Sequence, residues 1–355
     1  MLIWTENPIN EMWKQLKFIS YKENCRNLLI GKIKSGRTLI YSTTDTILER
    51  KIDEISMCIQ QGIEYFDAAN RITINTSPLL VYYGMLSLAK ALVVANSKDT
   101  FIDDIKYHGL STRPVNAELE AFRSDKTNWC IENEFAVVNS GVFNSLNTLI
   151  NPSRVLHKDS IINIKNSISC VPEMKALFEK FYNEHSNSFD MYTELKEFET
   201  GKLEFAIGNE ENPEKLFKCI PKITNDFEQT ENMHNLFPHF RSKENMKIEQ
   251  IDYIENYSSF VGGRYIISGL KYEINGQENK MIIDQVLIDY MVLFILGEQV
   301  RYHQDLWGKL VRGENSGTIG LLEIYIDIVK RRFPNEILNR LFEEDFDYGT
   351  PARFS

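Results

Sequence analysis

The residue types best suited to chemistry stand together just after a long apolar run. Arg301 and His303 place a permanent cation next to a side chain that titrates near neutral pH, and Trp307 adds an aromatic ring. A histidine can move a proton while an arginine stabilises the charge that develops on a phosphoryl group. The same cations would also stabilise a helix C-terminus, which carries partial negative charge. Both interpretations stay open at this point.

A second candidate is the turn Tyr107-His108-Gly109, which follows another apolar run. A histidine in this position either serves a ligand or hydrogen-bonds at a corner of the fold. The catalytic residues are therefore unknown, and the candidates for catalysis are Arg301, His303 and His108. The candidates for ligand binding are Arg264, Arg301, His303, Trp307, Tyr83 and His108.

Other motifs carry weaker signals. His234 and His239 are close in sequence but lack a cysteine partner or helical spacing, so we expect no metal site there. Glu278 and Lys280 match part of a metal-dependent nuclease signature whose aspartate partner is not evident. The glycine-rich stretch 313–320 lacks the lysine of a phosphate-binding loop. The sequence predicts neither a metal nor a cofactor.

Two apolar helices must position the candidate residues. Residues 78–95 and about 285–300 are apolar on nearly every side, so each must be surrounded by protein or by lipid. Lys90 interrupts the first run, and no flank of positive charge orients it in a bilayer. We therefore expect both helices to be buried in the protein, and no membrane partner.

The remaining patterns predict a mainly α fold of the α+β class, a helical bundle around the two buried helices with a small β-containing insert at about 200–283. The turn Asn275-Gly276, preceded by a β-rich run, is the strongest hairpin signal. Pro334 is expected to end one helix and separate it from a last short one. Helices are expected over 45–68, 117–123, 141–149, 172–181, 319–333 and 335–342, and strands over 202–207, 264–274 and 280–283. The expected division is a helical lobe over 1–199, the insert over 200–283 and a C-terminal helical segment over 284–345.

The composition limits the function classes. Fifty acidic residues against 40 basic ones give the 355-residue chain a net charge of −10, which argues against a general electrostatic hold on nucleic acid. The five cysteines are far apart and form no CxxC pair, which favours reduced thiols. The first residues lack the pattern of a secretory signal. We expect a cytoplasmic protein.

Two blocks of sequence resemble a known family. They are TSPLLVYYGMLSLAKALVVAN with YHGLS, and DYMVLFILGEQVRYHQDLWGKLV with RRFPNEILNRL. Together, and in this order, they resemble the YaaC-like family of bacterial proteins. The resemblance implies a bacterial protein from a family without an assigned biochemical activity.

The first block also resembles, more distantly, the helical bundles of the HEPN class, through Tyr82, Tyr83, Lys90 and the His108-Gly109 turn. That resemblance implies a bundle in the N-terminal lobe and, in many members, a dimer that cuts RNA without metal. The family motif is an arginine, four to six residues and then a histidine. None of the six histidines here has an arginine at that spacing. The chain thus departs from the catalytic pattern while keeping the bundle.

These observations lead to three functional expectations. The first is a cytoplasmic, non-catalytic component that binds a nucleotide, RNA or a partner protein, in stress or phage defence. The second is a metal-independent ribonuclease of HEPN type with a rearranged site, in which Arg301 and His303 meet His108 or Arg264. The third is a structural subunit of an oligomer, for which a homodimer is the simplest form.

Overall fold

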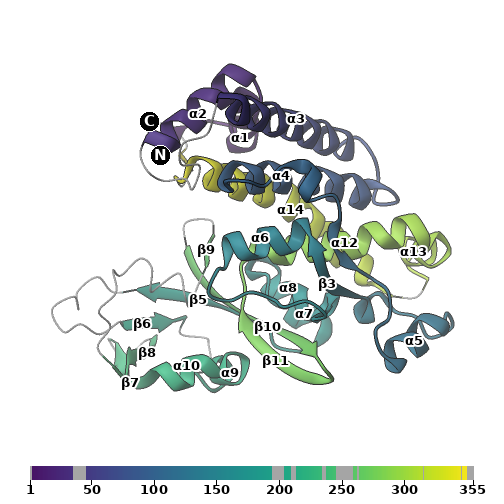
Figure 1. The fold of residues 1–355 in the computed structure, drawn as a ribbon. Helices are drawn as coiled ribbons and strands as arrows, with labels where there is room; N and C mark the ends of the chain where they lie inside the picture. Colours follow the sequence, from purple (N-terminus) through teal and green to yellow (C-terminus); the bar gives the residue numbers. More distant parts are fainter. Residues whose placement is uncertain are drawn as a thin grey trace, which may run out of the picture.

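The two apolar helices form the centre of the fold, as their composition predicts. α4 (Ser77–Asn96) and α12 (Gln285–Tyr302) pack against each other, and nearly all of their side chains are buried. In the computed structural model α4 lies between α3 (Asp45–Ala69) and α12, and α14 (Thr318–Phe342) also packs on it (Figure 1). The prediction of two buried helices is confirmed.

The structure describes most of the chain. The described residues are 2–34, 45–193, 204–208, 213–233, 237–244, 259–261, 264–314, 316–344 and 346–349. The other helices among them are α1 (Pro8–Ile19), α2 (Lys22–Lys34), α5 (Ala117–Ser124), α6 (Val142–Ile150), α7 (Ile164–Ile168), α8 (Lys175–Tyr182), α9 (Pro213–Cys219), α10 (Pro221–Asp226) and α13 (Gln304–Val311), with 3₁₀ turns at Ile102–Asp104, Ile131–Asn133 and Pro172–Met174. The short helices expected near 117, 141 and 172 are confirmed.

Glycines let α3 and α4 approach closely. A Cβ atom on Gly84 would lie 2.7 Å from the ring of Phe66, and one on Gly62 would lie 2.8 Å from Leu88. Because any larger side chain would push the helices apart, these positions set the distance between the two axes. The tight contact explains how α4 can be enclosed on this side without a polar stripe of its own.

The helix α14 corrects one expectation. Pro334 was expected to separate two helices, but α14 runs from Thr318 to Phe342 with the proline inside it. A proline inside a helix removes one backbone hydrogen bond and clashes with the preceding turn, which destabilises the helix. The helix propensities of the neighbouring residues would not offset this cost. Phe333 and Ile337, on either side of Pro334, are fully buried. Their packing in the core holds the helix together across the proline.

The strands form an antiparallel sheet beside the helices (Figure 1). Along it, β10 pairs with β4 near one end and with β5 near the other, so it links the two halves. The order is β2 (His108–Ser111), β3 (Phe135–Gly141), β4 (Ile161–Asn163), β10 (Arg264–Ile274), β5 (Ser188–Thr193), β6 (Glu204–Ile207), β8 (Phe237–Ser242) and β7 (Phe227–Met233), with β11 (Gln277–Ile282) and β9 (Ser259–Val261) also on β10. A separate parallel pair joins β1 (Leu2–Trp4) to β12 (Asp347–Gly349).

The extent of the sheet differs from the expectation of a small insert. The hairpin at Asn275-Gly276 is confirmed, with both residues at positive φ between β10 and β11. However, β2, β3, β4 and β5 all precede residue 200. Residues 135–138 of β3 are buried consecutively, so they give no alternation, and β4 has three residues. The fold is mixed α+β, while the bundle and the three-part division stay predictions.

The helix α4 is long and apolar enough to cross a membrane by length and composition alone. Within the described residues it is the one helix that meets this criterion, and 78% of its most apolar window is buried inside the protein. Buried core helices pass the same test. The expectation that the protein has no membrane partner therefore stays a prediction.

Candidate functional site

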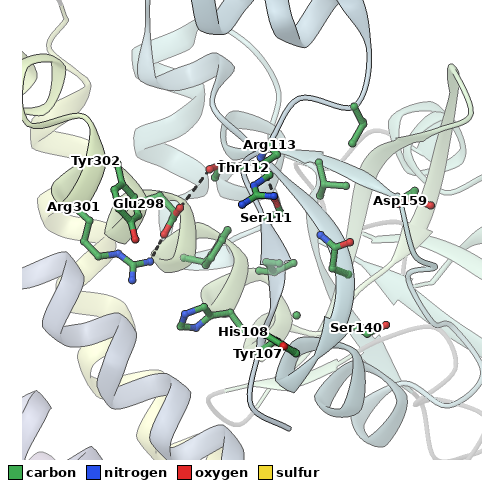
Figure 2. Close-up of a pocket in the computed structure, with 16 residues that line it drawn as sticks. Tyr107, His108, Ser111, Thr112, Arg113, Ser140, Asp159, Glu298, Arg301 and Tyr302 are labelled. Carbon is green, nitrogen blue, oxygen red and sulfur yellow. Dashed lines mark hydrogen bonds and ion pairs between the residues drawn. The ribbon is translucent and has the colours of Figure 1, made fainter.

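A cleft of about 620 Å³ opens between the edge strand β2 and the last turns of α12 (Figure 2). Such a volume is in the range of small-molecule sites. One wall is nearly continuous in sequence, because it follows the chain from Tyr107 to Arg113. The lining residues are Tyr107, His108, Gly109, Leu110, Ser111, Thr112, Arg113, Val115, Val137, Asn139, Ser140, Asp159, Phe294, Glu298, Arg301 and Tyr302.

His108 is held from two sides by buried tyrosines. Its Nδ1 atom lies 2.9 Å from Oη of Tyr82, on α4, and its carbonyl oxygen accepts a hydrogen bond of 2.9 Å from Oη of Tyr290, on α12. Partial burial lowers the pKa of His108, and the positive charges of Arg301 and Lys90 lower it further. The imidazole is therefore neutral at pH 7.

Two glycines fix the backbone at this point. Gly109 has φ +84° and Gly141 has φ +143°, which few other residues adopt. A Cβ atom on Gly109 would lie 2.6 Å from the backbone nitrogen of Phe143, and one on Gly141 would lie 2.4 Å from the carbonyl oxygen of Tyr107. The start of β2 thus packs directly on the junction of β3 and α6, and His108 has little freedom to move.

Arg301 is built into the opposite wall. Its guanidinium forms an ion pair with Glu298, one turn earlier on α12, and its Nη1 donates a hydrogen bond of 2.9 Å to Oη of Tyr83. Burial works against the charged form, but the negative charge of Glu298 and the nearby tyrosines outweigh it and raise the pKa of Arg301. Of the five N–H donors of the guanidinium, these two hydrogen bonds use two.

The two walls meet through Glu298. Oγ1 of Thr112, on the β2 side, donates a hydrogen bond of 3.4 Å to this carboxylate, which also pairs with Arg301. Figure 2 shows Thr112, Glu298 and Arg301 in a row, with the His108 ring at the Arg301 end. The structure therefore brings His108 and Arg301 to the same end of one cleft, although they are far apart in sequence.

The rim of the cleft is more exposed and carries groups that a ligand can reach. Tyr107 and Tyr302 are 77% and 67% exposed. Arg113 is also exposed, and no side-chain partner holds its guanidinium among the described residues. Two acidic lining residues, Glu298 and Asp159, balance the two arginines. The cleft offers donors and aromatic faces without a strong net charge.

The other predicted site residues lie elsewhere. His303 follows the last residue of α12 and does not line the cleft. Burial lowers the pKa of its imidazole, and the nearby charges are those of Arg123, Glu134, Asp305 and Lys126. Trp307 is buried on α13, where Nε1 donates a hydrogen bond of 3.1 Å to the carbonyl oxygen of Asn75. Arg264 begins β10, and its side chain is outside the described part of the structure. Because α12 ends at Tyr302, the residues that follow it, including His303 and Trp307, do not continue along the wall of the cleft.

Several lining residues were not selected from the sequence. Glu298 precedes Arg301 by three positions, a spacing that pairs opposite charges on a helix, so this signal was available. Thr112 and Arg113 follow an edge strand too short to recognise from the sequence. Tyr82 does not line the cleft but holds His108. It lies inside an apolar helix, where nothing in the sequence indicates a hydrogen bond to His108.

The weaker motifs form no metal site in the part of the chain that the structure describes, where no three potential ligands gather. His239 contacts Thr230 through Nδ1 and Glu204 through Nε2, and His234 is outside the described residues. Lys280, from the partial nuclease signature, donates a hydrogen bond of 2.7 Å to the carbonyl oxygen of Lys218. The expectation of no metal stays a prediction.

A family model described as YaaC-like Protein matches residues 42–341, which is most of the chain. No curated protein and no solved structure matches. The matched segment contains α4, β2 and α12, and thus every residue that lines the cleft. The resemblance to HEPN bundles receives no support from these comparisons and stays a prediction.

Proposed function

This chain belongs to the YaaC-like family, and from that premise and the geometry of the cleft we propose that it binds a mononucleotide without cleaving it. The observation that carries the proposal is the convergence of His108 and Arg301 in one cleft with an unpaired arginine and two exposed tyrosine rings at its rim. Each group matches one part of a nucleotide.

The cations match the phosphate. No side chain among the described residues occupies the donors of Arg113. Arg301 keeps one free N–H on each terminal nitrogen, Nη1 and Nη2, while its Nε is buried. Guanidinium groups bind phosphate oxygens through paired, charge-assisted hydrogen bonds. The exposed rings of Tyr107 and Tyr302 offer faces on which a base can stack, and such stacking contributes about 1–3 kcal/mol per base.

The charge balance favours a single nucleotide over a long RNA. Proteins that hold RNA backbones use many lysines and arginines, and each neutralised phosphate adds to the affinity. Here Glu298 and Asp159 offset Arg301 and Arg113, and the whole chain carries a net charge of −10. A ligand that depends on a few directed hydrogen bonds and one stacked base suits this cleft better than a polyanion.

Equilibrium dialysis with ribonucleoside mono-, di- and triphosphates tests the proposal. At least one nucleotide should bind saturably. Arg113→Ala should lower its affinity about tenfold, which is the lower end of the effect expected for the loss of one charge-assisted hydrogen bond. Arg113 has no side-chain partner in the part of the chain that the structure describes, so this variant should fold normally. Lys309→Ala removes an exposed cation outside the cleft and should leave the affinity unchanged. Absence of binding across the panel would refute the proposal.

Cleavage of RNA is the alternative that the sequence raised. It needs a histidine that accepts a proton beside an arginine, and the pair with suitable placement is His108 with Arg301 rather than His303 with Arg301. Incubation of labelled RNA with the protein and a chelator measures this activity, and we expect the RNA to stay intact. A homodimer, a partner protein, a cytoplasmic location and a role in stress or phage defence stay proposals.

A further inference from the structure

The hydrogen bond between Tyr82 and His108 decides what the histidine can do in the cleft. A neutral imidazole carries its proton on one of two nitrogens, and the hydrogen bond at the other nitrogen selects between them. Nδ1 of His108 is the nitrogen that Tyr82 contacts. The question is which partner supplies the hydrogen.

The buried hydroxyls around the ring answer it. The hydrogen of Tyr290 is committed to the carbonyl oxygen of His108, because a carbonyl can only accept. Tyr82 is fully buried, so its own hydrogen needs an acceptor. The hydroxyl of Tyr290 also lies beside that of Tyr82 and affects its pKa. However, of the two possible acceptors only Nδ1 of His108 meets the distance and angle of a well-formed hydrogen bond. The acceptor with good geometry is Nδ1 of His108, at 2.9 Å.

We infer that Tyr82 is a positioning residue that donates its hydrogen to Nδ1 of His108 and so fixes the proton of the neutral imidazole on Nε2. The opposite arrangement, in which Nδ1 donates to Tyr82, would leave a buried hydroxyl hydrogen without a well-aligned acceptor, which is unfavourable. Tyr82 acts through His108 and has no contact with the ligand.

The consequence is a hydrogen-bond donor at the cleft surface. Nε2 of His108 has no hydrogen-bond partner among the described residues, and it is not one of the buried polar atoms that lack one. With the proton on Nε2, this atom donates to a ligand oxygen. It cannot take a proton from a ribose hydroxyl, because it already carries one and Nδ1 is occupied by Tyr82.

This inference rests on the proposed function for the identity of the ligand, and it deepens that function. It assigns the cleft to a ligand that presents an oxyanion acceptor, such as a phosphate group, to His108. It also gives a structural reason for binding without cleavage, since the neutral histidine is held in the form that cannot serve as a general base at Nε2.

Nitrogen NMR of the ligand-free protein tests the inference directly. Protein with ¹⁵N-labelled histidine is measured at pH 8, where His108 is neutral, and His108→Gln identifies its signals by their loss. The expected spectrum has the proton on Nε2 alone. A proton on Nδ1, or an even mixture of the two forms, would overturn the inference and would favour the ribonuclease alternative.

A variant provides the second arm. Donation to Nδ1 stabilises the neutral ring, so Tyr82→Phe should move the NMR titration of His108 to higher pH. The charged and titratable groups facing the ring are Lys90 and Tyr82 on α4, with Tyr290 and Arg301 on α12, and this variant changes one of them. Tyr192→Phe removes the hydroxyl of an exposed tyrosine on β5 that does not line the cleft. It is the control and should leave the titration of His108 in place.

An unchanged titration in folded Tyr82→Phe would contradict the role of Tyr82. If this variant does not fold, the spectrum of the unmodified protein decides alone. Because no ligand is present in either arm, the result is independent of nucleotide binding. A protein with the proton on Nε2 that binds no nucleotide would contradict the proposed function and leave the inference intact.

Discussion

Arg301 and Tyr83 join the end of one apolar helix to the beginning of the other. Nη1 of Arg301, in the last turn of α12, donates a hydrogen bond of 2.9 Å to Oη of Tyr83, in the second turn of α4. The guanidinium also lies 5.6 Å from the centre of the Tyr83 ring. This contact fixes the wall of the cleft to the core, so a change in it should affect stability and the site together.

Removal of the Tyr83 hydroxyl measures how much this contact contributes to stability. Tyr83→Phe keeps the ring under the guanidinium and loses one hydrogen bond to a charged group, for which we expect a loss of about 1.5–3 kcal/mol. Urea unfolding followed by circular dichroism gives the value. Tyr302→Phe, which alters an exposed ring at the same guanidinium, serves as the control. Equal stability of all three proteins would show that the contact does not hold the wall.

The glycine at the start of β2 should tolerate no side chain. Gly109→Ala combines a positive φ with a Cβ atom 2.6 Å from the backbone of Phe143, and the strained backbone alone costs about 1–3 kcal/mol. Gly276→Ala is the matched control, because that residue also has positive φ but no atom within 4 Å of the added Cβ. We expect a clearly larger drop in melting temperature for Gly109→Ala. Equal drops would show that the backbone can move away.

The core depends on a buried charge network between α12 and α14. Asp289 is fully buried, and its carboxylate accepts hydrogen bonds of 2.6 and 3.0 Å from Arg332 and of 2.8 Å from Tyr325. Arg332→Met leaves this carboxylate without its cation, so we predict a loss of about 3–5 kcal/mol. The double variant Arg332→Met with Asp289→Asn should recover part of it. No recovery in chemical denaturation would show that the two charges are not coupled.

Stability should fall as the solution becomes acidic, in part because of His108. Its pKa is lowered in the folded state by burial and by Arg301 and Lys90, so the unfolded chain binds the proton first as the pH drops below about 6.5. Between that value and the lower folded pKa, each step toward acid favours unfolding. Urea unfolding at pH 8 and pH 5.5 should therefore show a smaller loss for His108→Gln than for the unmodified protein. An equal loss in both would mean that His108 titrates normally.

The sequence predicted the helices better than the site. α4 and α12 were recognisable because they are apolar on nearly every side, and such a helix has to be enclosed. The continuation of α14 through Pro334 was not predictable, since it depends on distant packing around Phe333 and Ile337. The sheet was underestimated because β2 and β4 are short and β3 is buried without alternation.

His108 and Arg301 were both recognisable as candidates, but their partnership was not. Proximity in sequence suggested that Arg301 acts together with His303. In the structure α12 ends at Tyr302, between these two residues, and the tertiary fold places Arg301 beside β2. The role of Tyr82 depends on a contact between α4 and β2, and no local pattern in either segment indicates it.

Mapping the binding site of a nucleotide by NMR tests the central claim most directly. Each nucleotide of the dialysis panel is added stepwise to ¹⁵N-labelled protein, and the backbone amide signals are followed to saturation. We predict that the largest changes fall on residues 107–113 and 298–302, the two walls of the cleft, and that Arg113→Ala weakens them. Changes confined to other parts of the chain, or no change at millimolar nucleotide, would contradict the assignment of this cleft.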